Sequence, residues 1–147
     1  MRRLRLARFA LVVAAVAARA EPPPAPEAIA VVVGRESFVT TVTRDELRDL
    51  YLRRQRLWPN GALAIPVNLP AGSAHREEFS KAVLGRSTAD LVAYWNGRYF
   101  EGIRPPVVLP SAAAVRAYLA AEPAAIGYLP AGEVDDGCRV LLTLPRR

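Results

Sequence analysis

The segment LAIPVNLPAGSAHREEFSKAVLG, residues 63–85, contains the pattern that decides the fold. Leu63–Asn68 is a short, mostly apolar run, which predicts a buried strand. Pro70–Ser73 follows as a tight loop, because Pro and Gly favour turns. Ser73 is a good N-cap for a helix that runs to about Leu84, and Gly85 is suited to end it. A strand, a tight loop and a capped helix thus follow one another directly.

The alternation of strands and helices continues on both sides of this segment. Further strands are expected at Ile29–Val33, Val107–Leu109, Ala125–Leu129 and Val140–Leu144. Further helices are expected after the N-cap residues Thr43, Ser87 and Ser111, with Glu46 and Asp90 completing capping boxes at the first two. Strands that alternate with helices of this length predict an α/β fold with a mainly parallel sheet and helical crossovers.

The N-terminus has the three parts of a secretory signal peptide. A basic stretch up to Arg8 precedes the apolar run Phe9–Ala18, which ends in the small-residue pattern Ala18-Arg19-Ala20. We expect a Sec-type signal in residues 1–20 that is cleaved after Ala20, and therefore a periplasmic or secreted protein. The alternative is an uncleaved anchor or a buried core helix. No later stretch is apolar enough to span a membrane once the signal is cleaved.

Removal of the signal changes the charge of the protein. The whole chain carries a net charge of +6, and five arginines leave with residues 1–20, so the mature chain carries +1. This small charge gives no reason to expect a nucleic-acid partner. We expect a Pro-rich spacer at residues 21–28 and one domain at residues 29–144. Cys138 is the only cysteine, so it forms no intramolecular disulfide; it is either a small apolar strand residue or a reactive thiol.

The loop at Asn68–Ser73 is the candidate ligand site, because ligands of α/β sheets bind outside the carboxyl ends of strands. The first amides of a helix have no intrahelical acceptor, and the helix dipole favours negative charge there. An anion site would comprise Gly72, the backbone near Ser73, Ala74 and His75, the Ser73 hydroxyl, and Arg76 if that side chain faces the loop. The alternative is that Gly-Ser serves only to cap the helix.

The sequence gives no support for catalysis, a metal or a cofactor. His75 is the only histidine, and no Cys or carboxylate spacing typical of a metal site accompanies it. Ser73 and His75 lack the strained G-x-S-x-G turn and the orienting acid of a nucleophile and base pair. We therefore expect a protein that is not an enzyme and has neither a metal nor another cofactor.

Three segments, in the same order, resemble the periplasmic phosphate-binding proteins of ABC importers, and especially their short single-domain relatives. They are Thr43–Trp58, Val67–Ser73 and Pro123–Tyr128, the last similar to the P-G-A-I-G-Y strand of that family. The resemblance implies a type II periplasmic-binding-protein fold, of which this chain matches chiefly one lobe. It also implies phosphate as the ligand and an envelope transporter as a partner.

The chain departs from the family pattern at the phosphate loop. Gly72 and Ser73 match the family's Gly-Ser, whereas Leu69, Ala71 and His75 stand where the family has an Arg, an Asp and a Thr. The family's N-terminal Gly-rich phosphate segment also has no counterpart before Ile29. The bidentate cation that would grip phosphate is therefore missing from its usual place.

Two functions follow from these observations. The first is an exported solute-binding-like protein of the phosphate ABC transporter type, which binds phosphate or another small anion at Gly72-Ser73. The second is an interaction or sensory module of the cell envelope that keeps the fold and docks to a sensor, transporter or other partner. A positive cleft around Ser73 with Arg76 converging on it would favour the first. An exposed apolar or aromatic patch, including Trp58 or Tyr99, would favour the second.

Overall fold

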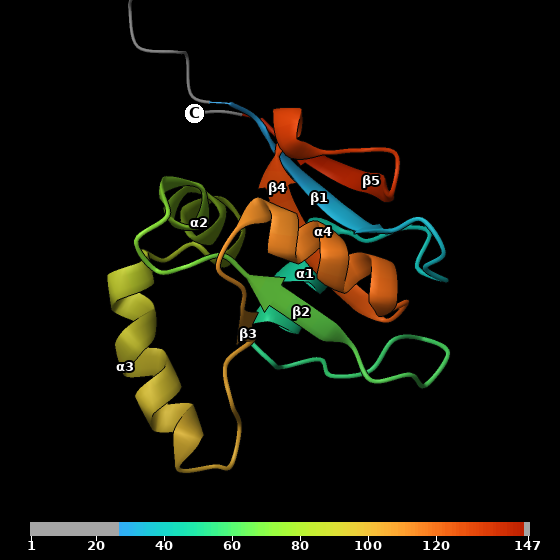
Figure 1. Ribbon diagram of the computed structural model, residues 1–147. Coiled ribbons are helices and arrows are strands. Elements are labelled where there is room, and N and C mark those ends of the chain that lie inside the picture. The colour runs from blue at the N-terminus through green and yellow to red at the C-terminus, as the bar shows by residue number, and fades with distance from the viewer. Residues whose placement is uncertain (1–26, 146–147) are drawn as a thin grey trace, which may run out of the picture.

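The computed structural model describes residues 27–145, and Figure 1 shows a single five-stranded sheet with helices on both faces. The expected signal peptide, residues 1–20, and the spacer up to residue 26 lie outside the described residues. The strands are β1 (Ile29–Gly34), β2 (Ile65–Asn68), β3 (Val107–Val108), β4 (Ala125–Pro130) and β5 (Cys138–Leu144). Their order across the sheet is β3-β2-β4-β1-β5.

The predicted α/β fold with a mainly parallel sheet is confirmed. β2 runs parallel to both of its neighbours, β3 and β4. β1 is antiparallel to both β4 and β5, so β5 points in the same direction as β4. Four of the five strands therefore share one direction, and β1 alone opposes them.

The helices begin where the capping residues predicted. They are α1 (Arg44–Tyr51), α2 (Ala74–Phe79), α3 (Thr88–Tyr99) and α4 (Ala112–Ala121). Thr43 and Glu46 form the expected capping box, as do Ser87 and Asp90. α2 continues as a π-helical segment, Ser80–Leu84, and Gly85 ends it with a φ of 67°, the left-handed conformation that glycine adopts easily.

Some strand bounds differ from the prediction. β2 begins at Ile65 rather than Leu63, because Leu63 is exposed and forms an isolated bridge with Leu57 instead. β5 begins two residues earlier than expected, at Cys138, because Cys138 and Arg139 pair with the end of β1. The Arg139 guanidinium also donates to the carbonyls of Ser37 and Val39, at 2.8 and 2.7 Å.

The two faces of the sheet are covered by different helices. Side chains alternate between the faces of a strand, so cross-strand partners share a face. Val32 pairs with Gly127 on the face that α4 covers, where a Cβ at residue 127 would meet Val115 of α4. Val31 pairs with Tyr128 on the opposite face, where α1 and α2 lie (Figure 1).

Three aromatic rings form the centre of the core on the α1 and α2 face. The rings of Phe79 and Tyr128 are stacked, with centroids 3.9 Å apart and planes 4° from parallel. Tyr51 tilts against Phe79 at 4.7 Å. All three side chains are buried, and together they join α1, α2 and β4. Aromatic pairs of this kind contribute about 0.5–1.5 kcal/mol beyond their buried area.

α3 is different, because it stands away from the sheet (Figure 1). Leu91 is its only fully buried residue. The Tyr94 hydroxyl anchors it by donating to the Leu52 carbonyl at 2.7 Å. None of the helices within residues 27–145 has the length and apolar character that a membrane crossing needs.

Gly34 provides a test of the contact between α4 and the sheet. A Cβ at this position would clash with the backbone carbonyl of Leu119 in α4. We expect Gly34→Ala to lower the free energy of unfolding by about 1–3 kcal/mol, because backbone cannot yield as a flexible side chain does. Gly72→Ala is the control, since nothing lies within 4 Å of its Cβ position. Urea unfolding of both variants measures the difference, and equal stability would contradict this packing.

Candidate functional site

The candidate site lies at the carboxyl edge of the parallel strands β2 and β3. Because these strands are parallel neighbours, the loops that follow them leave from the same edge. The loop after β2 leads into α2, and the loop after β3 leads into α4. The amide of Leu109 donates to the carbonyl of Asn68 at 2.8 Å, which holds the two loops together.

Both helices that begin at this edge have serine caps. The Ser111 hydroxyl accepts from the amide of Ala114 at 3.1 Å. The Ser73 hydroxyl accepts from the amide of Arg76 at 3.4 Å, which is a long and weak hydrogen bond. The first amides of α2, at Ala74 and His75, have no intrahelical acceptor. The edge therefore presents amide donors from two helices, and the Ser73 hydroxyl is only loosely engaged.

A buried polar network fixes the start of the loop. The Tyr128 hydroxyl donates to Asn68 Oδ1 at 2.9 Å and accepts from the amide of Leu69 at 3.3 Å. Beside it, the Tyr51 hydroxyl donates to the carbonyl of Val67 at 2.8 Å. The sequence motif around Tyr128 was visible as a strand pattern, but nothing in the sequence predicted that its hydroxyl positions the loop.

Arg76 faces the loop, as the anion hypothesis requires. One of its guanidinium nitrogens donates to the carbonyl of Leu69 at 3.0 Å, and the side chain is half-buried. Its other N–H donors have no hydrogen bond within residues 27–145. Ala71, Gly72 and Ala74 are exposed, so the loop is open to solvent rather than enclosed.

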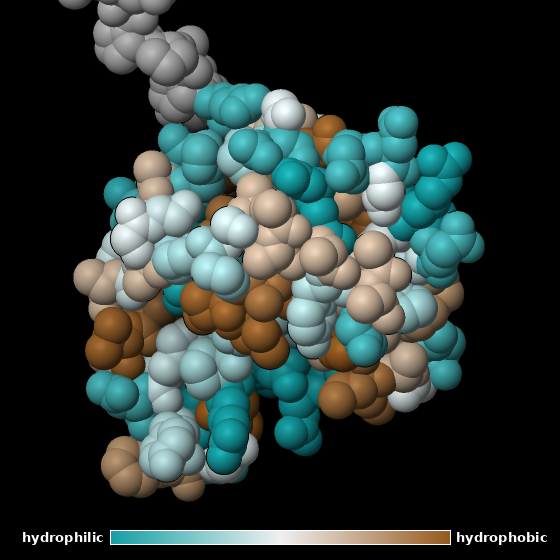
Figure 2. All heavy atoms as spheres, viewed as in Figure 1, coloured by the Kyte–Doolittle hydropathy of each residue, from teal (hydrophilic) through white to brown (hydrophobic). Residues whose placement is uncertain are grey.

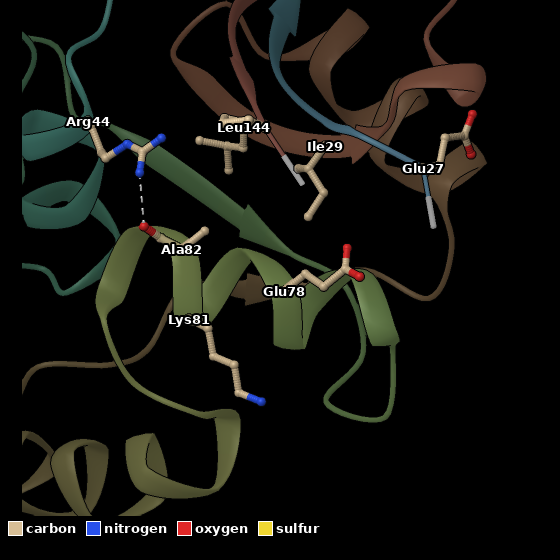
Figure 3. A pocket seen from close by; sticks show the side chains of 8 residues that line it. Glu27, Ile29, Arg44, Glu78, Lys81, Ala82 and Leu144 are labelled. Atoms are coloured by element: carbon tan, nitrogen blue, oxygen red, sulfur yellow. Dashed lines mark hydrogen bonds between the residues drawn. The ribbon is translucent and has the colours of Figure 1, made fainter. Parts of the chain in front are cut away.

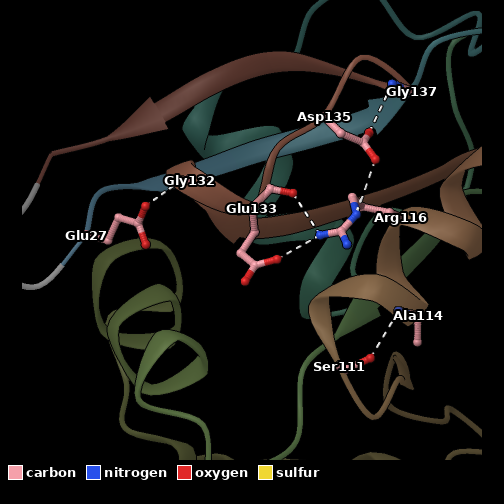
Figure 4. A network of polar contacts seen from close by, with 8 residues as sticks. All are labelled: Glu27, Ser111, Ala114, Arg116, Gly132, Glu133, Asp135 and Gly137. Atoms are coloured by element: carbon pink, nitrogen blue, oxygen red, sulfur yellow. Dashed lines mark hydrogen bonds and ion pairs between the residues drawn. The ribbon is translucent and has the colours of Figure 1, made fainter.

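A second arginine near this edge is neutralised by carboxylates (Figure 4). Arg116 of α4 contacts the Glu133 carboxylate at 2.9 Å and the Asp135 carboxylate at 3.3 Å. Asp135 also accepts from the amide of Gly137 at 3.0 Å. The sequence did not single out Arg116, because its acidic partners lie 17 and more residues away along the chain. This arginine stabilises the segment after β4 and adds little positive potential for an anion.

The three positions that depart from the phosphate-loop pattern now have a physical description. Leu69 is only 5% exposed and belongs to the core, so this position supplies packing instead of a cation. Ala71 is an exposed loop residue without polar atoms in its side chain. His75 is half-buried in the first turn of α2. Arg76 is therefore the cation that the described loop itself provides.

The two remaining candidate residues, Cys138 and Trp58, have structural roles. Burial and the nearby Asp135 raise the pKa of the Cys138 thiol, which keeps it protonated at neutral pH. Trp58 is buried, and its indole N–H donates to the carbonyl of Ala124 at 2.8 Å. Within residues 27–145, no three His, Cys, Asp or Glu side chains come together as metal ligands.

The fold matches solved structures of phosphate receptors. An ABC-type phosphate transport receptor from Vibrio cholerae matches with a TM-score of 0.63 and 20% identity, over 78% of this chain and 45% of that one. A putative phosphate ABC transporter substrate-binding protein with bound phosphate from Clostridium perfringens matches with a TM-score of 0.63 and 19% identity, over 78% and 44%. PstS from Borrelia burgdorferi matches with a TM-score of 0.59 and 16% identity, over 78% and 46%.

This chain has the fold of a phosphate-receptor lobe. The likeness that the three sequence segments indicated is thereby confirmed at the level of the fold. The chain spans less than half the length of these proteins. No family model and no curated protein matches its sequence.

The buried hydroxyls beneath the loop predict how stability depends on pH. Burial raises the pKa of Tyr128 and of Tyr51 above the ordinary value of about 10. Each hydroxyl stays protonated in the folded protein at a pH where the unfolded chain has lost that proton. The contribution of these two hydroxyls to stability is therefore fully present below about pH 10 and is lost as the pH rises further, by up to about 1.4 kcal/mol per pH unit for each group.

Denaturant unfolding between pH 8 and 12 measures this dependence. Tyr128→Phe should lose stability at pH 8, because Asn68 and Leu69 lose their partner. The variant should also show a shallower decline above pH 10 than the unmodified protein. Parallel pH curves for the two proteins would mean that Tyr128 does not stay protonated in the fold.

Proposed function

We propose that this chain is an exported solute-binding-like protein of the phosphate-receptor type that binds a small anion, phosphate in the first place. The anion would lie against Gly72, the Ser73 hydroxyl and the amides of Ala74 and His75, and Arg76 would supply the charge. The Ser73 amide, which the sequence also suggested, takes no part, because it donates to the carbonyl of Pro70 at 2.9 Å. The observation that carries the proposal is the meeting of two serine-capped helix starts at one sheet edge, with Arg76 directed at the loop between them. The bound phosphate in the Clostridium perfringens structure supports the choice of ligand.

The described groups predict weak binding. Amide donors and one guanidinium are suited to phosphate, but the bidentate grip of a second arginine is missing because Leu69 is in the core. The loop is open to solvent, so water and salt screen each contact. Binding should therefore depend strongly on ionic strength. A partner that covers the edge would reduce this screening.

The proposal includes export and the absence of catalysis. Residues 1–20 would direct the chain to the periplasm or the outside of the cell, where an envelope transporter or sensor protein would be its partner. The structural neighbours are binding proteins, which supports a role without catalysis. The anion would be held and released unchanged, and neither a cofactor nor a nucleic acid takes part.

The exposed side chains of α3 favour a second function, which is docking to an envelope protein. Tyr99 is 67% exposed and Phe100 is 89% exposed at the end of this protruding helix, and Val92 is exposed on the same helix. Figure 2 shows isolated hydrophobic residues among polar ones at the surface of this part of the molecule. Large exposed aromatic side chains are typical of protein interfaces. In this case the receptor fold would describe ancestry, and Trp58, being buried, would take no part.

Calorimetric titration of residues 21–147 with phosphate, sulfate and acetate tests the first function. We expect saturable phosphate binding that weakens as salt is added. Ser73→Ala should reduce phosphate affinity about three- to tenfold, because one hydrogen-bond donor is lost. It should also cost about 1 kcal/mol of stability through the lost cap.

Ser87→Ala is the matched control, because Ser87 caps α3 away from the candidate edge. It should lower stability by a similar amount and leave phosphate affinity unchanged. If none of the anions binds, or if both variants bind phosphate as the unmodified protein does, the proposed site is wrong.

The docking function is tested by photo-crosslinking in intact cells. A photoreactive residue at position 100 should give one discrete crosslinked product, because Phe100 would lie in the interface. The control is the same residue at position 36, because Glu36 is exposed in the loop that follows β1, and Figure 1 shows this loop away from α3. The same products from both positions, or none from position 100, would exclude docking through α3.

A further inference from the structure

The segment between α1 and β2 presents two leucines to the solvent. Leu57 and Leu63 are opposite one another in an isolated antiparallel bridge, and they are 53% and 57% exposed. The backbone hydrogen bonds on either side of this bridge, at 2.8 Å each, join the flanking residues, so the two leucines form a non-hydrogen-bonded pair. Side chains are closest together in such pairs. The leucines therefore form one apolar spot on one face of a short hairpin, residues 56–64.

The other face of this hairpin is fixed to the domain. Trp58 is only 5% exposed, and its indole N–H donates to the carbonyl of Ala124, just before β4, at 2.8 Å. The side chain of Asn60 accepts from the amide of Ala62 at 3.0 Å and closes the turn. Neighbouring residues of a strand point to opposite faces. Because Trp58 anchors the inner face, the two leucines stay on the outer one.

Three arginines lead into the hairpin from the end of α1, at positions 53, 54 and 56. One guanidinium nitrogen of Arg53 donates to the carbonyl of Ala64 at 3.2 Å, which places its charge next to the leucine pair. Partial burial and the nearby charge of Arg56 lower the pKa of Arg53, which indicates that these two cations lie near each other.

The positive charge of these arginines is largely unbalanced. Arg54 contacts the Asp49 carboxylate at 3.6 Å, and both side chains are exposed, so the pair is weak. Arg53 and Arg56 form no ion pair with any residue that the structure describes. The hairpin therefore combines exposed apolar side chains with cations that are free to meet an anionic surface.

Charge on the far side of the molecule is mixed instead. A cleft of about 400 Å³ lies between α2 with its π-helical continuation and the start of β1 and the end of β5 (Figure 3). The charged residues that line it are of both signs: Arg44, Lys81, Glu27 and Glu78. Such a surface offers no net attraction to an anionic partner, so the hairpin is the better candidate for one.

The hairpin lies at the amino end of β2, which is the opposite edge of the sheet from the candidate anion site (Figure 1). β1 is antiparallel to β4, so the loop after β1 leaves from this same edge. Phe38 of that loop is 43% exposed and lines a shallow groove of about 330 Å³ together with Pro59 of the hairpin. The exposed apolar surface thus extends over two loops.

We propose that this edge docks on a bilayer surface that carries anionic phospholipid headgroups. Leu57 and Leu63 would enter the boundary between headgroups and acyl chains, and the three arginines would lie among the lipid phosphates, which guanidinium groups bind well. An acidic protein would also attract the arginines. A protruding aliphatic pair at the tip of a basic loop, however, suits a soft boundary that closes around it. Docking in this way would leave the anion edge open to solvent, and it does not depend on anion binding.

Co-sedimentation of residues 21–147 with vesicles tests the proposal. These residues contain the whole described fold and lack the apolar run of residues 9–18, which would bind lipid by itself. Vesicles of equal parts phosphatidylglycerol and phosphatidylcholine are compared with vesicles of phosphatidylcholine alone. We expect binding to the anionic vesicles that high salt largely abolishes, because salt screens exposed charges. No binding to the anionic vesicles, or equal binding to both kinds, would overturn the proposal.

The double variant Arg54→Gln with Arg56→Gln tests the arginines. It should weaken binding to the anionic vesicles about 25-fold, because each arginine near such a surface contributes about 1 kcal/mol, or about fivefold. The control is Arg44→Gln, an exposed cation at the other end of α1, which should change binding less than about twofold. Equal weakening per arginine at position 44 would mean that the charge of the whole molecule attracts the lipid, and the hairpin would be excluded as the docking site.

The double variant Leu57→Ser with Leu63→Ser tests the apolar contact. It should weaken binding roughly tenfold and leave the salt dependence unchanged, since only buried apolar area is lost. Val92→Ser on α3 is the control, because Val92 is 60% exposed and lies outside the hairpin. Circular dichroism checks that each variant is folded. If the leucine variant binds as the unmodified protein does, the leucines do not enter the bilayer and the proposed docking is wrong.

Discussion

The stacking of Tyr128 on Phe79 is the contact on which the rest of the structure depends. Phe79 ends α2 and Tyr128 lies in β4, the central strand, so the stack fixes the helix against the middle of the sheet. The hydroxyl of the same tyrosine forms hydrogen bonds with Asn68 and Leu69 at the end of β2. One buried side chain therefore determines where the helix lies and where the loop before it starts.

The positive charges at the carboxyl edge are largely engaged within the fold. Arg76 is bound to the loop carbonyl, and Arg116 is bound to two carboxylates. Each arginine thus stabilises the fold with part of its hydrogen-bonding capacity. What remains for a ligand is a set of amide dipoles with one partly engaged cation. Such a set favours an anion, and a covering partner would strengthen it by excluding water.

Local sequence signals predicted the local structure well. The caps at Thr43, Ser73, Ser87 and Ser111 act within one helical turn, so the residues that make them are close in the sequence. The direction of the strands also followed from their alternation with helices. The antiparallel direction of β1 was not evident, because its partners β4 and β5 are at the other end of the chain.

The candidate site was predictable only in part, for the same reason. The Gly-Ser turn and Arg76 are adjacent in the sequence, and their spacing suggested the site. Other contacts join residues from different elements. These are the hydrogen bond from Tyr128 to Asn68 and the ion pairs of Arg116 with Glu133 and Asp135. The cleft beside Glu78 likewise draws its lining from both ends of the described chain. Single-sequence patterns carry no information on such distant neighbours.

The place of β1 between β4 and β5 has a consequence for how the chain folds. The first strand pairs only with the last two, so most of the chain must be present before either edge of β1 is satisfied. Contacts between such distant segments require the closure of a long loop, which slows folding. A chain that is released N-terminus first would thus complete this sheet only after β5 has emerged. The topology itself delays completion of the sheet until all five strands are available.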